Sequence, residues 1–340
     1  MYLNDRARQL MNAFCAGMAR EYGVESTERY FAMTDPKETS LRAALMESVE
    51  ILNMITCLDV DQLSGQVIQV GASGLHTGRK EGGRFIRRVG VDGNEYKLVE
   101  TDSCAALAWD VLSVWANSGK TEDEFFQLVQ TFSNQAFALD MLRVGFNGKS
   151  VEKTTDPEKN PNGEDVNKGW HAIMTDWDAG KQVMTDAVTL DDKGDYRSLD
   201  AMASDLINTK IPQQFRTDPR LVVLAGADLV AAEQFRLYQG ADKPTEKIAA
   251  QMLGNTIAGR PAIVPPFMPG KRMIVTMLPN LHIYTQRNTR QRKNAFEDDR
   301  KQYENKYLRN EGYAVEVPEL YAAIDENAVT IGELTEPKEG

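Results

Sequence analysis

The 340-residue sequence predicts an α+β fold with either two sub-domains or one domain with large excursions, because the chain is longer than one ordinary compact domain requires. Three observations lead to this prediction. A long helix has a clear start signal at Thr121, a glycine-rich stretch of strand-like runs precedes it, and strands alternate with helices after Gly194.

Composition places the chain among soluble globular proteins, with 42% hydrophobic, 26% charged and 8% aromatic residues. The formal net charge of −11 argues against general phosphate binding, because affinity for a polyanion depends mainly on clustered Lys and Arg. A negative net charge is compatible with a protein that encloses nucleic acid without binding it tightly.

The three cysteines, Cys15, Cys57 and Cys104, are too few and too widely spaced for a disulfide framework or a zinc site, and they indicate a reducing compartment. The N-terminus is charged where a secretory signal would be apolar. No stretch approaches the ~20 apolar residues that span a bilayer. We therefore expect a cytoplasmic protein with no membrane association.

Residues 1–31 are predicted to form a separable helix with balanced charge. Its apolar residues recur at helical spacing and are Leu10, Met11, Phe14, Cys15, Met18 and Tyr22. The segment is either a detachable assembly element or an ordinary N-terminal helix. A second helix is predicted to begin near Ser40, with Pro36 separating the two.

Residues 64–103 are predicted to form a two-stranded ribbon, because glycines interrupt strand-like runs such as RFIRRVGV and EYKLVE. Arms of ~15 residues would reach roughly 50 Å. An isolated hairpin is at best marginally stable in water, so this ribbon needs another surface to lie on.

Thr121 opens the clearest helix, since Glu124 stands at the capping-box spacing. Gly145 is the predicted C-terminal stop. A helix of this length spans on the order of 35 Å and could form the axis of an elongated domain.

Residues 149–169 read as an exposed loop, and a second unit begins at GDYRSLDAM. Its helices and its strands LVVLAG, PAIV, RMIVTML and LHIYT predict a compact mixed sheet. After Arg287 the chain is highly charged until YAVEVPELYAAI, which predicts a terminal strand.

Two segments imitate nucleotide-binding motifs. GFNGKS ends like a phosphate loop, but Arg143 stands where the required first glycine would be. LVVLAGADLVAAE resembles a dinucleotide turn but offers only Gly226 for close approach to a pyrophosphate. We expect neither to bind a nucleotide.

The histidines His76, His171 and His282 lie in separate segments, and none has a second ligand at metal-binding spacing. His171 could be combined with Asp176 and Asp178 into an acid/base site, but solvated carboxylates on a loop are favoured. The run RNTRQRK from Arg287 could touch nucleic acid, although EDD follows it, and a solvated face with internal ion pairs is favoured. No catalytic residue, metal or cofactor is therefore expected.

Seven segments, taken in order, resemble the major capsid proteins of Peduovirus-type temperate tailed phages. They are GFNGKS, NKGWHAIM, GDYRSLDAM, DPRLVVLAGADLVA, IAGRPAIVPPFMP, NLHIYTQRNTRQR and KQYENKYLRNEGYAVEVPELYAAI. The resemblance depends on their order along the chain, the loop lengths, and the glycine-rich ribbon before a long helix.

The resemblance implies the HK97-type capsid fold and assigns its parts to residue ranges. They are an N-terminal assembly segment (1–31), an N-terminal arm (32–63), an extended β-ribbon loop (64–104), a peripheral domain (105–194) with a spine helix (121–144), an axial domain (195–286), and return strands of the peripheral domain with a C-terminal tail (287–340).

The resemblance further implies a structural role in the virion capsid. Many copies, as pentamers and hexamers, would form an icosahedral shell in the host cytoplasm and enclose double-stranded DNA without sequence-specific binding. A portal protein and a scaffolding or maturation protease would be partners. The protease would remove the first segment between Phe31 and Ala32.

Charge complementarity between copies is a further hypothesis from the sequence. The extended loop carries Arg79, Lys80, Arg84, Arg87 and Arg88, and the start of the spine helix carries Glu122, Asp123 and Glu124. In the implied arrangement these groups face one another between neighbours, and the alternative is that both sets are solvated surface charges. Two alternatives stay open, a nanocompartment shell protein of the same fold and, less favoured, a cytoplasmic enzyme.

Overall fold

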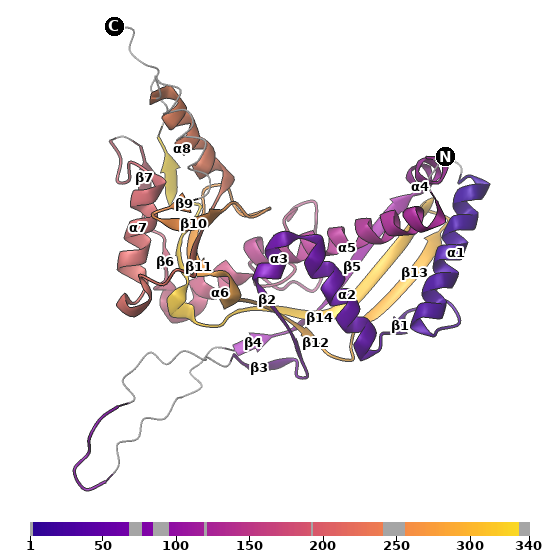
Figure 1. Ribbon diagram of the computed structural model, residues 1–340, viewed down its shortest axis with the longest axis horizontal. Coiled ribbons are helices and arrows are strands. Elements are labelled where there is room, and N and C mark those ends of the chain that lie inside the picture. The colour runs from indigo at the N-terminus through magenta and orange to yellow at the C-terminus, as the bar shows by residue number, and fades with distance from the viewer. Residues whose placement is uncertain are drawn as a thin grey trace.

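The computed structural model describes residues 3–67, 77–83, 95–118, 121–191, 193–240 and 256–332. Two six-stranded sheets form its frame, and helices pack against each of them (Figure 1). Within these ranges, no helix combines the length and the hydropathy needed to cross a bilayer.

The first sheet is built around the longest strand, β14. Its strands are β1 (Phe31–Ala32), β2 (Thr56–Val60), β5 (Val99–Ala108), β12 (Leu281–Gln286), β13 (Gln291–Glu297) and β14 (Gln302–Val315). β5 pairs antiparallel along one side of β14, and β13 and then β12 pair antiparallel along the other side. β1 and β2 lie outside β13 and β12.

Helices from the first half of the chain cover one face of this sheet. They are α1 (Asp5–Tyr22), α2 (Asp35–Ser48), α3 (Glu50–Met54), α4 (Trp109–Asn117) and α5 (Glu122–Asn147). Ala105, Leu107, Tyr303 and Tyr307 point into this layer and are buried against α1, α2 and α5. The alternate side chains of β5, such as Asp102, point the other way and are exposed.

The capping box predicted at the start of the long helix is confirmed. The backbone N–H of Glu124 donates to Thr121 Oγ1 (3.3 Å), and the backbone N–H of Thr121 donates to Glu124 Oε2 (3.1 Å). α5 runs on past the predicted stop at Gly145 to Asn147 and is 26 residues long. At 1.5 Å per residue it spans about 39 Å.

The second sheet is mixed, as predicted. Its strands are β6 (Val183–Met184), β8 (Leu221–Ala225), β9 (Thr256–Ile257), β10 (Arg260–Ile263), β11 (Met273–Met277) and β15 (Ala322–Ile324). α7 (Leu199–Lys210) and α8 (Ala227–Gly240) accompany it. All five residues of β8 and all five of β11 are buried, which is typical of central strands.

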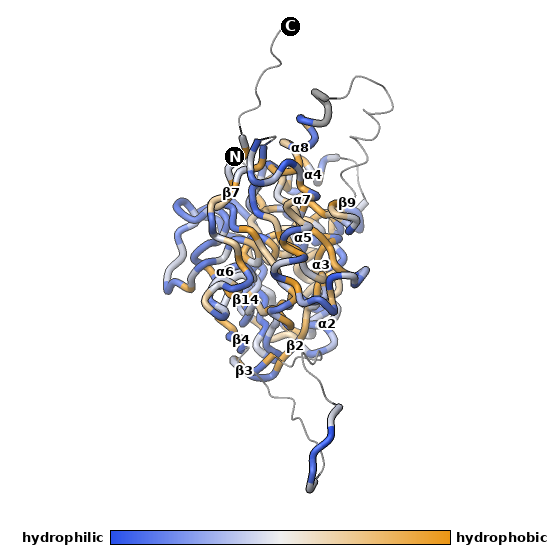
Figure 2. Tube along the Cα trace, turned by 90° about the vertical axis from the view of Figure 1, so that its left-hand side faces the viewer, coloured by the Kyte–Doolittle hydropathy of each residue, from blue (hydrophilic) through white to orange (hydrophobic). Residues whose placement is uncertain are grey.

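Short elements complete the fold. They are α6 (Trp170–Asp176), the pairs β3 (Ser64–Gln66) with β4 (Glu95–Lys97) and β7 (Val188–Leu190) with β16 (Val329–Ile331), and the 3₁₀ helices η1 (Trp177–Gly180), η2 (Gln213–Phe215), η4 (Leu278–Asn280) and η5 (Pro318–Leu320). In Figure 2 hydrophobic residues concentrate in the middle of the molecule.

Two predicted strand assignments are wrong. LHIYT, predicted in the second unit, forms β12 of the first sheet, whereas Ala322–Ile324, predicted to return to the first unit, forms β15 beside β11 of the second sheet. An apolar strand pattern shows that a strand is buried but does not say which sheet buries it.

Two predicted boundaries also shift. The ribbon is confirmed at its base, where β3 pairs antiparallel with β4, but residues from Val99 onward already belong to β5 of the first sheet. The second helix begins at Asp35 instead of near Ser40. Pro36 lies in its first turn, where a missing N–H costs nothing.

Candidate functional site

The N-terminal helix predicted from the sequence forms and is docked on the body of the protein. Met11, Phe14 and Met18 of α1 are buried against α4, α5 and Tyr303. The ring of Phe14 lies 5.5 Å from that of Phe126 and 6.5 Å from that of Tyr303. α1 therefore contributes to the core of the 340-residue chain.

The predicted processing residues lie at the edge of the first sheet. Phe31 and Ala32 form β1 and pair with Arg292 and Gln291 of β13. Phe31 is buried, and its ring centroid lies 5.3 Å from that of Tyr22, while Ala32 is exposed. The junction is thus extended backbone, with one exposed and one buried side chain.

The acidic residues predicted to contact a neighbour lie on the surface. Glu122, Asp123 and Glu124 are exposed in the first turn of α5, where carboxylates interact favourably with the helix dipole. One carboxylate oxygen of Glu124 already accepts the backbone N–H of Thr121 in the capping box, so this side chain is less available to a neighbouring copy.

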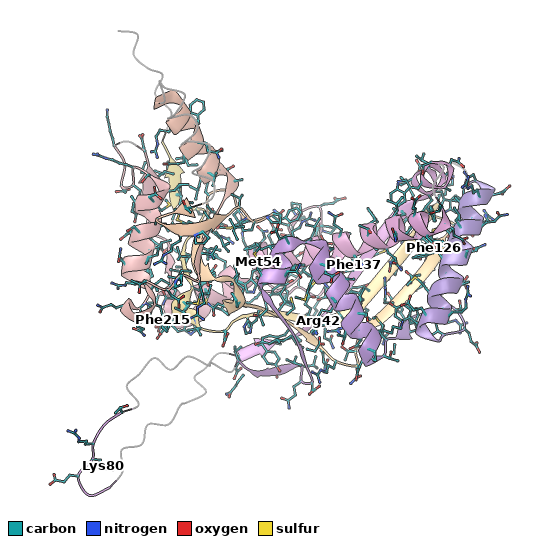
Figure 3. All side chains as sticks on the ribbon, in the orientation of Figure 1. Arg42, Met54, Lys80, Phe126, Phe137 and Phe215 are labelled. Carbon is teal, nitrogen blue, oxygen red and sulfur yellow. The ribbon has the colours of Figure 1, made fainter. Side chains whose placement is uncertain are left out.

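Among the predicted basic residues, Arg79 and Lys80 are exposed on the turn formed by residues 77–83, and a bridge joins Lys80 to Gly83. Figure 3 labels Lys80 on this turn, well separated from the helices and sheets. Arg84, Arg87 and Arg88 lie outside the described residues. The pairing between copies therefore stays a prediction.

The basic run after Arg287 is not the solvated face that was predicted. Arg290 and Arg292 are buried. Arg290 pairs with Glu38 of α2 (3.4 Å) and with Asp59 of β2. The predicted internal ion pairs are therefore present, but they fasten α2 and β2 to the sheet and leave these arginines unavailable to nucleic acid.

The two nucleotide-like segments form turns that are held by backbone hydrogen bonds. The N–H groups of Lys149 and Ser150 in GFNGKS both donate to the carbonyl of Glu164. At the start of α8, the N–H groups of Asp228 and Leu229 donate to the carbonyl of Gly270. A Cβ at Gly226 would collide with that same carbonyl oxygen, so close backbone packing explains this glycine.

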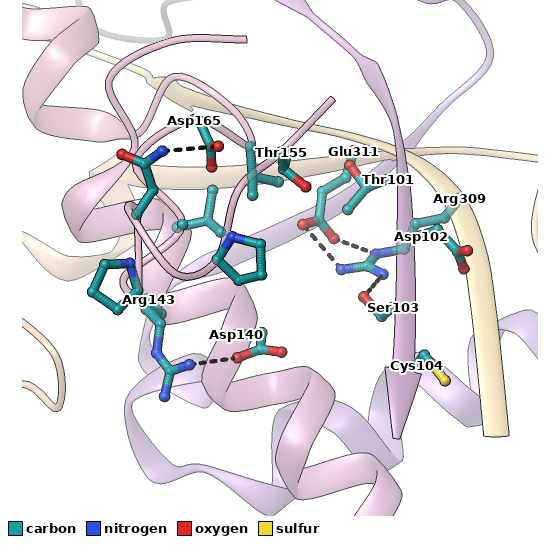
Figure 4. Close-up of a pocket in the computed structure, with 16 residues that line it drawn as sticks. Thr101, Asp102, Ser103, Cys104, Asp140, Arg143, Thr155, Asp165, Arg309 and Glu311 are labelled. Carbon is teal, nitrogen blue, oxygen red and sulfur yellow. Dashed lines mark hydrogen bonds and ion pairs between the residues drawn. The ribbon is translucent and has the colours of Figure 1, made fainter. Parts of the chain in front are cut away.

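A cavity of about 210 Å³ lies between β5, α5, β14 and the loop containing residues 155–166 (Figure 4). Its two arginines are already paired, Arg143 with Asp140 (3.3 Å) and Arg309 with Glu311 (2.6 Å). Burial raises the pKa of Asp102 and of Asp140. The cavity thus offers an anionic ligand no free cation among the described lining residues.

His171 belongs to a largely buried polar cluster with Tyr321 and Asp325. Its Nδ1 lies 3.2 Å from the hydroxyl of Tyr321, and its Nε2 lies 3.1 Å from Asp325 Oδ2. Burial lowers the pKa of His171, and the hydrogen bond from His171 lowers the pKa of Asp325. Asp176 and Asp178 are not near this ring and pair with Lys168 and Lys181 instead.

This cluster superficially resembles a catalytic triad or a metal site. Burial raises the pKa of Tyr321 above its ordinary value, which disfavours a nucleophilic phenolate. One ligand atom each from His171, Asp325 and Glu326 lie within 4.8 Å of one another, but Arg272 Nη2 already pairs with Glu326 (2.6 Å). The cluster is therefore satisfied by its own members. The sequence did not reveal it, because Tyr321 and Asp325 lie about 150 residues after His171.

The fold is also found in a solved viral assembly. The chain superposes on a subunit of "Satellite phage P4 procapsid including size determination (Sid) protein" with a TM-score of 0.76 and 24% sequence identity, covering 97% of this chain and 99% of that one. The HK97-type capsid fold predicted from the sequence is confirmed. The chain therefore has the fold of a capsid protein.

Sequence comparison identifies the particular family. The family model "Phage major capsid protein, P2 family" matches residues 10–327. The chain is 25% identical over 302 residues to "Capsid proteins" of Escherichia phage P2, with 83% of each chain covered. It is 24% identical over 306 residues to "Major capsid protein" of Serratia phage KSP20, with 83% of this chain and 82% of that one covered. The chain belongs to the P2 family of phage major capsid proteins, and its place is the capsid of the virion.

Proposed function

We propose that many copies of this chain assemble in the host cytoplasm, as pentamers and hexamers, into an icosahedral shell around double-stranded phage DNA. The family match over residues 10–327 carries this proposal. The net charge of −11 supports enclosure of DNA without sequence-specific binding. A portal protein and a scaffolding or maturation protease are the further partners, and the chain itself catalyses no reaction.

Negative-stain electron microscopy of the purified full-length protein tests this function. Closed shells are the expected result, and particles from infected cells should contain double-stranded DNA. A dispersed protein under all assembly conditions would argue for an enzyme. Shells that contain cargo protein and no DNA would point instead to a nanocompartment, which the family match disfavours.

Processing between Phe31 and Ala32 is the second prediction. β1 is an edge strand, so the backbone of the junction is already extended. Many peptides bind a partner protein in this conformation, by adding a strand to its sheet, and we propose that the protease recognises the junction in the same conformation. Mass spectrometry of mature particles should find chains that begin at Ala32. Full-length chains in infectious particles would rule this processing out.

The third prediction concerns the charges between neighbours. Changing Arg87 and Arg88 to Glu should lower shell yield more at low salt than at high salt, since salt screens exposed charges. Each exposed pair contributes only about 0 to 1 kcal/mol, but a closed shell repeats the pair many times. Changing Glu122 and Glu124 to Lys as well should partly restore the yield, whereas Lys153→Glu on an exposed loop is the control and should have little effect. An unchanged yield of the first variant at low salt would reject the pairing.

A further inference from the structure

Helix α6 connects the two sheets through two consecutive side chains. Trp170 points to the first sheet, where its Nε1–H donates to the carbonyl of His282 in β12 (3.0 Å). Its ring also packs 5.4 Å from the ring of Tyr313 in β14. His171 points to the second sheet, where Tyr321 precedes β15 and Asp325 follows it. α6 is therefore held by one sheet through Trp170 and by the other through His171.

Arg272 makes a second buried connection at the same place. It directly precedes β11 of the second sheet, and its guanidinium donates to the carbonyl of Phe146 near the end of α5. The same guanidinium pairs with Glu326 (2.6 Å), one residue beyond Asp325. The joint between the sheets thus combines a shared apolar cluster, to which Trp170 and Tyr321 belong, with polar contacts. In these contacts the buried His171 and Arg272 meet carboxylates that are only partly buried, and they are strong only while every member is satisfied.

We propose that His171 is a protonation-sensitive lock in this joint: the neutral ring holds α6 to the β15 side of the second sheet, and the protonated ring loosens that contact. This inference does not rest on shell assembly, because every group that it uses belongs to a single chain.

Hydrogen bonding explains why the neutral ring fits. When Nε2–H donates to Asp325, Nδ1 is free to accept the hydroxyl hydrogen of Tyr321, and all three groups are satisfied. Protonation places a hydrogen on Nδ1 as well. The Tyr321 hydroxyl must then turn its own hydrogen elsewhere in a fully buried position, which costs free energy.

The charges around His171 act in both directions. Arg272, before β11, disfavours a positive ring, while Asp325 and Glu326, after β15, favour it. Burial is the largest influence, and the net effect is a lowered pKa of His171. Because a histidine exposed by opening would titrate near ~6.5, the opened joint binds the proton more readily than the closed one. The lock is therefore intact above about pH 6.5. Below that pH, the population of the opened joint relative to the closed one rises by up to about tenfold per pH unit.

His282 provides a matched control. It is also buried, and burial likewise lowers its pKa. However, its partners are Tyr284 of its own strand (2.8 Å) and Glu316, which directly follows β14 (3.4 Å). The imidazole of His282 therefore contacts the first sheet alone, while its backbone carbonyl still accepts from Trp170, and its protonation should not loosen contacts around β15.

Hydrogen exchange followed by mass spectrometry tests the lock on dispersed full-length chains. Wild type, His171→Gln and His282→Gln are compared at about pH 7.5 and at about pH 5.5, and comparison at equal pH cancels the intrinsic exchange rates of all amides except those beside the substituted residue. The glutamine amide of His171→Gln can still donate to Asp325 but cannot titrate. At the lower pH, α6 and residues 321–326 should exchange up to about tenfold faster in wild type than in His171→Gln, with no difference at the higher pH. His282→Gln should behave like wild type in these segments.

Equal exchange of wild type and His171→Gln at the lower pH would overturn the proposal. Faster wild-type exchange spread evenly over β13 and β14 would also overturn it, since it would indicate global unfolding and not a local joint. If His171→Gln does not fold, the pH dependence of exchange in wild type tests the proposal by itself. Exchange of residues 321–326 relative to β14 must rise as the pH falls below about 6.5. Failure to form shells would leave every one of these outcomes unchanged.

Discussion

Replacing Trp170 by alanine is expected to lower the free energy of unfolding by about 4 kcal/mol or more. The side chain is among the largest that are fully buried, and it packs against Phe146 (5.2 Å between ring centroids) and Tyr313. Loss of a buried aromatic side chain typically costs about 3 to 5 kcal/mol, and the carbonyl of His282 loses its donor as well. Such a loss is a large part of the total stability of most domains, about 5 to 15 kcal/mol.

Urea unfolding of dispersed subunits measures this effect. The control is Trp115→Ala, because Trp115 lies on α4 beside Phe132 and is only partly buried. This substitution should lower the free energy of unfolding clearly less than Trp170→Ala does. The structure also explains Gly145, since a Cβ there would lie 2.5 Å from the Trp170 ring. If both tryptophan variants lost the same stability, Trp170 would not have the central packing role assigned to it.

Replacing Arg309 by methionine should lower the free energy of unfolding by about 3 to 5 kcal/mol, because the buried carboxylate of Glu311 then has no positively charged partner. Arg309 and Glu311 are each 3% exposed and form two hydrogen bonds (2.6 and 3.2 Å). Arg309 Nη1 also donates to Ser103 Oγ of β5 (2.9 Å) (Figure 4). Arg309 therefore adds a side-chain link between β14 and β5 to the backbone pairing of these two strands.

A double variant separates the loss of the pair from the cost of one unpaired charge. Arg309→Met combined with Glu311→Leu should be more stable than Arg309→Met alone in urea unfolding, because no isolated charge is then buried. The exposed pair of Lys159 and Asp156 is the control, and Lys159→Ala should cost at most about 1 kcal/mol. The assignment fails if Arg309→Met costs no more than Lys159→Ala.

Much of the local structure could be predicted from the sequence. The capping box at Thr121, the buried face of α1 with Met11 and Phe14, and the buried strands β8 and β11 all appear as expected. Each depends on residues a few positions apart, within the range of a helical turn or a strand. The family resemblance, and with it the capsid fold, was likewise readable from the order of the segments and is confirmed.

Tertiary structure alone decided which distant segments meet. The sequence did not indicate that β12 joins the first sheet and β15 the second, that Arg290 is buried between Glu38 and Asp59, or that His171 meets Tyr321 and Asp325. Helical periodicity and capping are set by neighbours along the chain and leave a local pattern. Sheet pairing and buried ion pairs can join segments far apart in the chain, as β2 with β12 and Glu38 with Arg290 do, and a polar residue has the same local pattern whether water or a distant charge satisfies it.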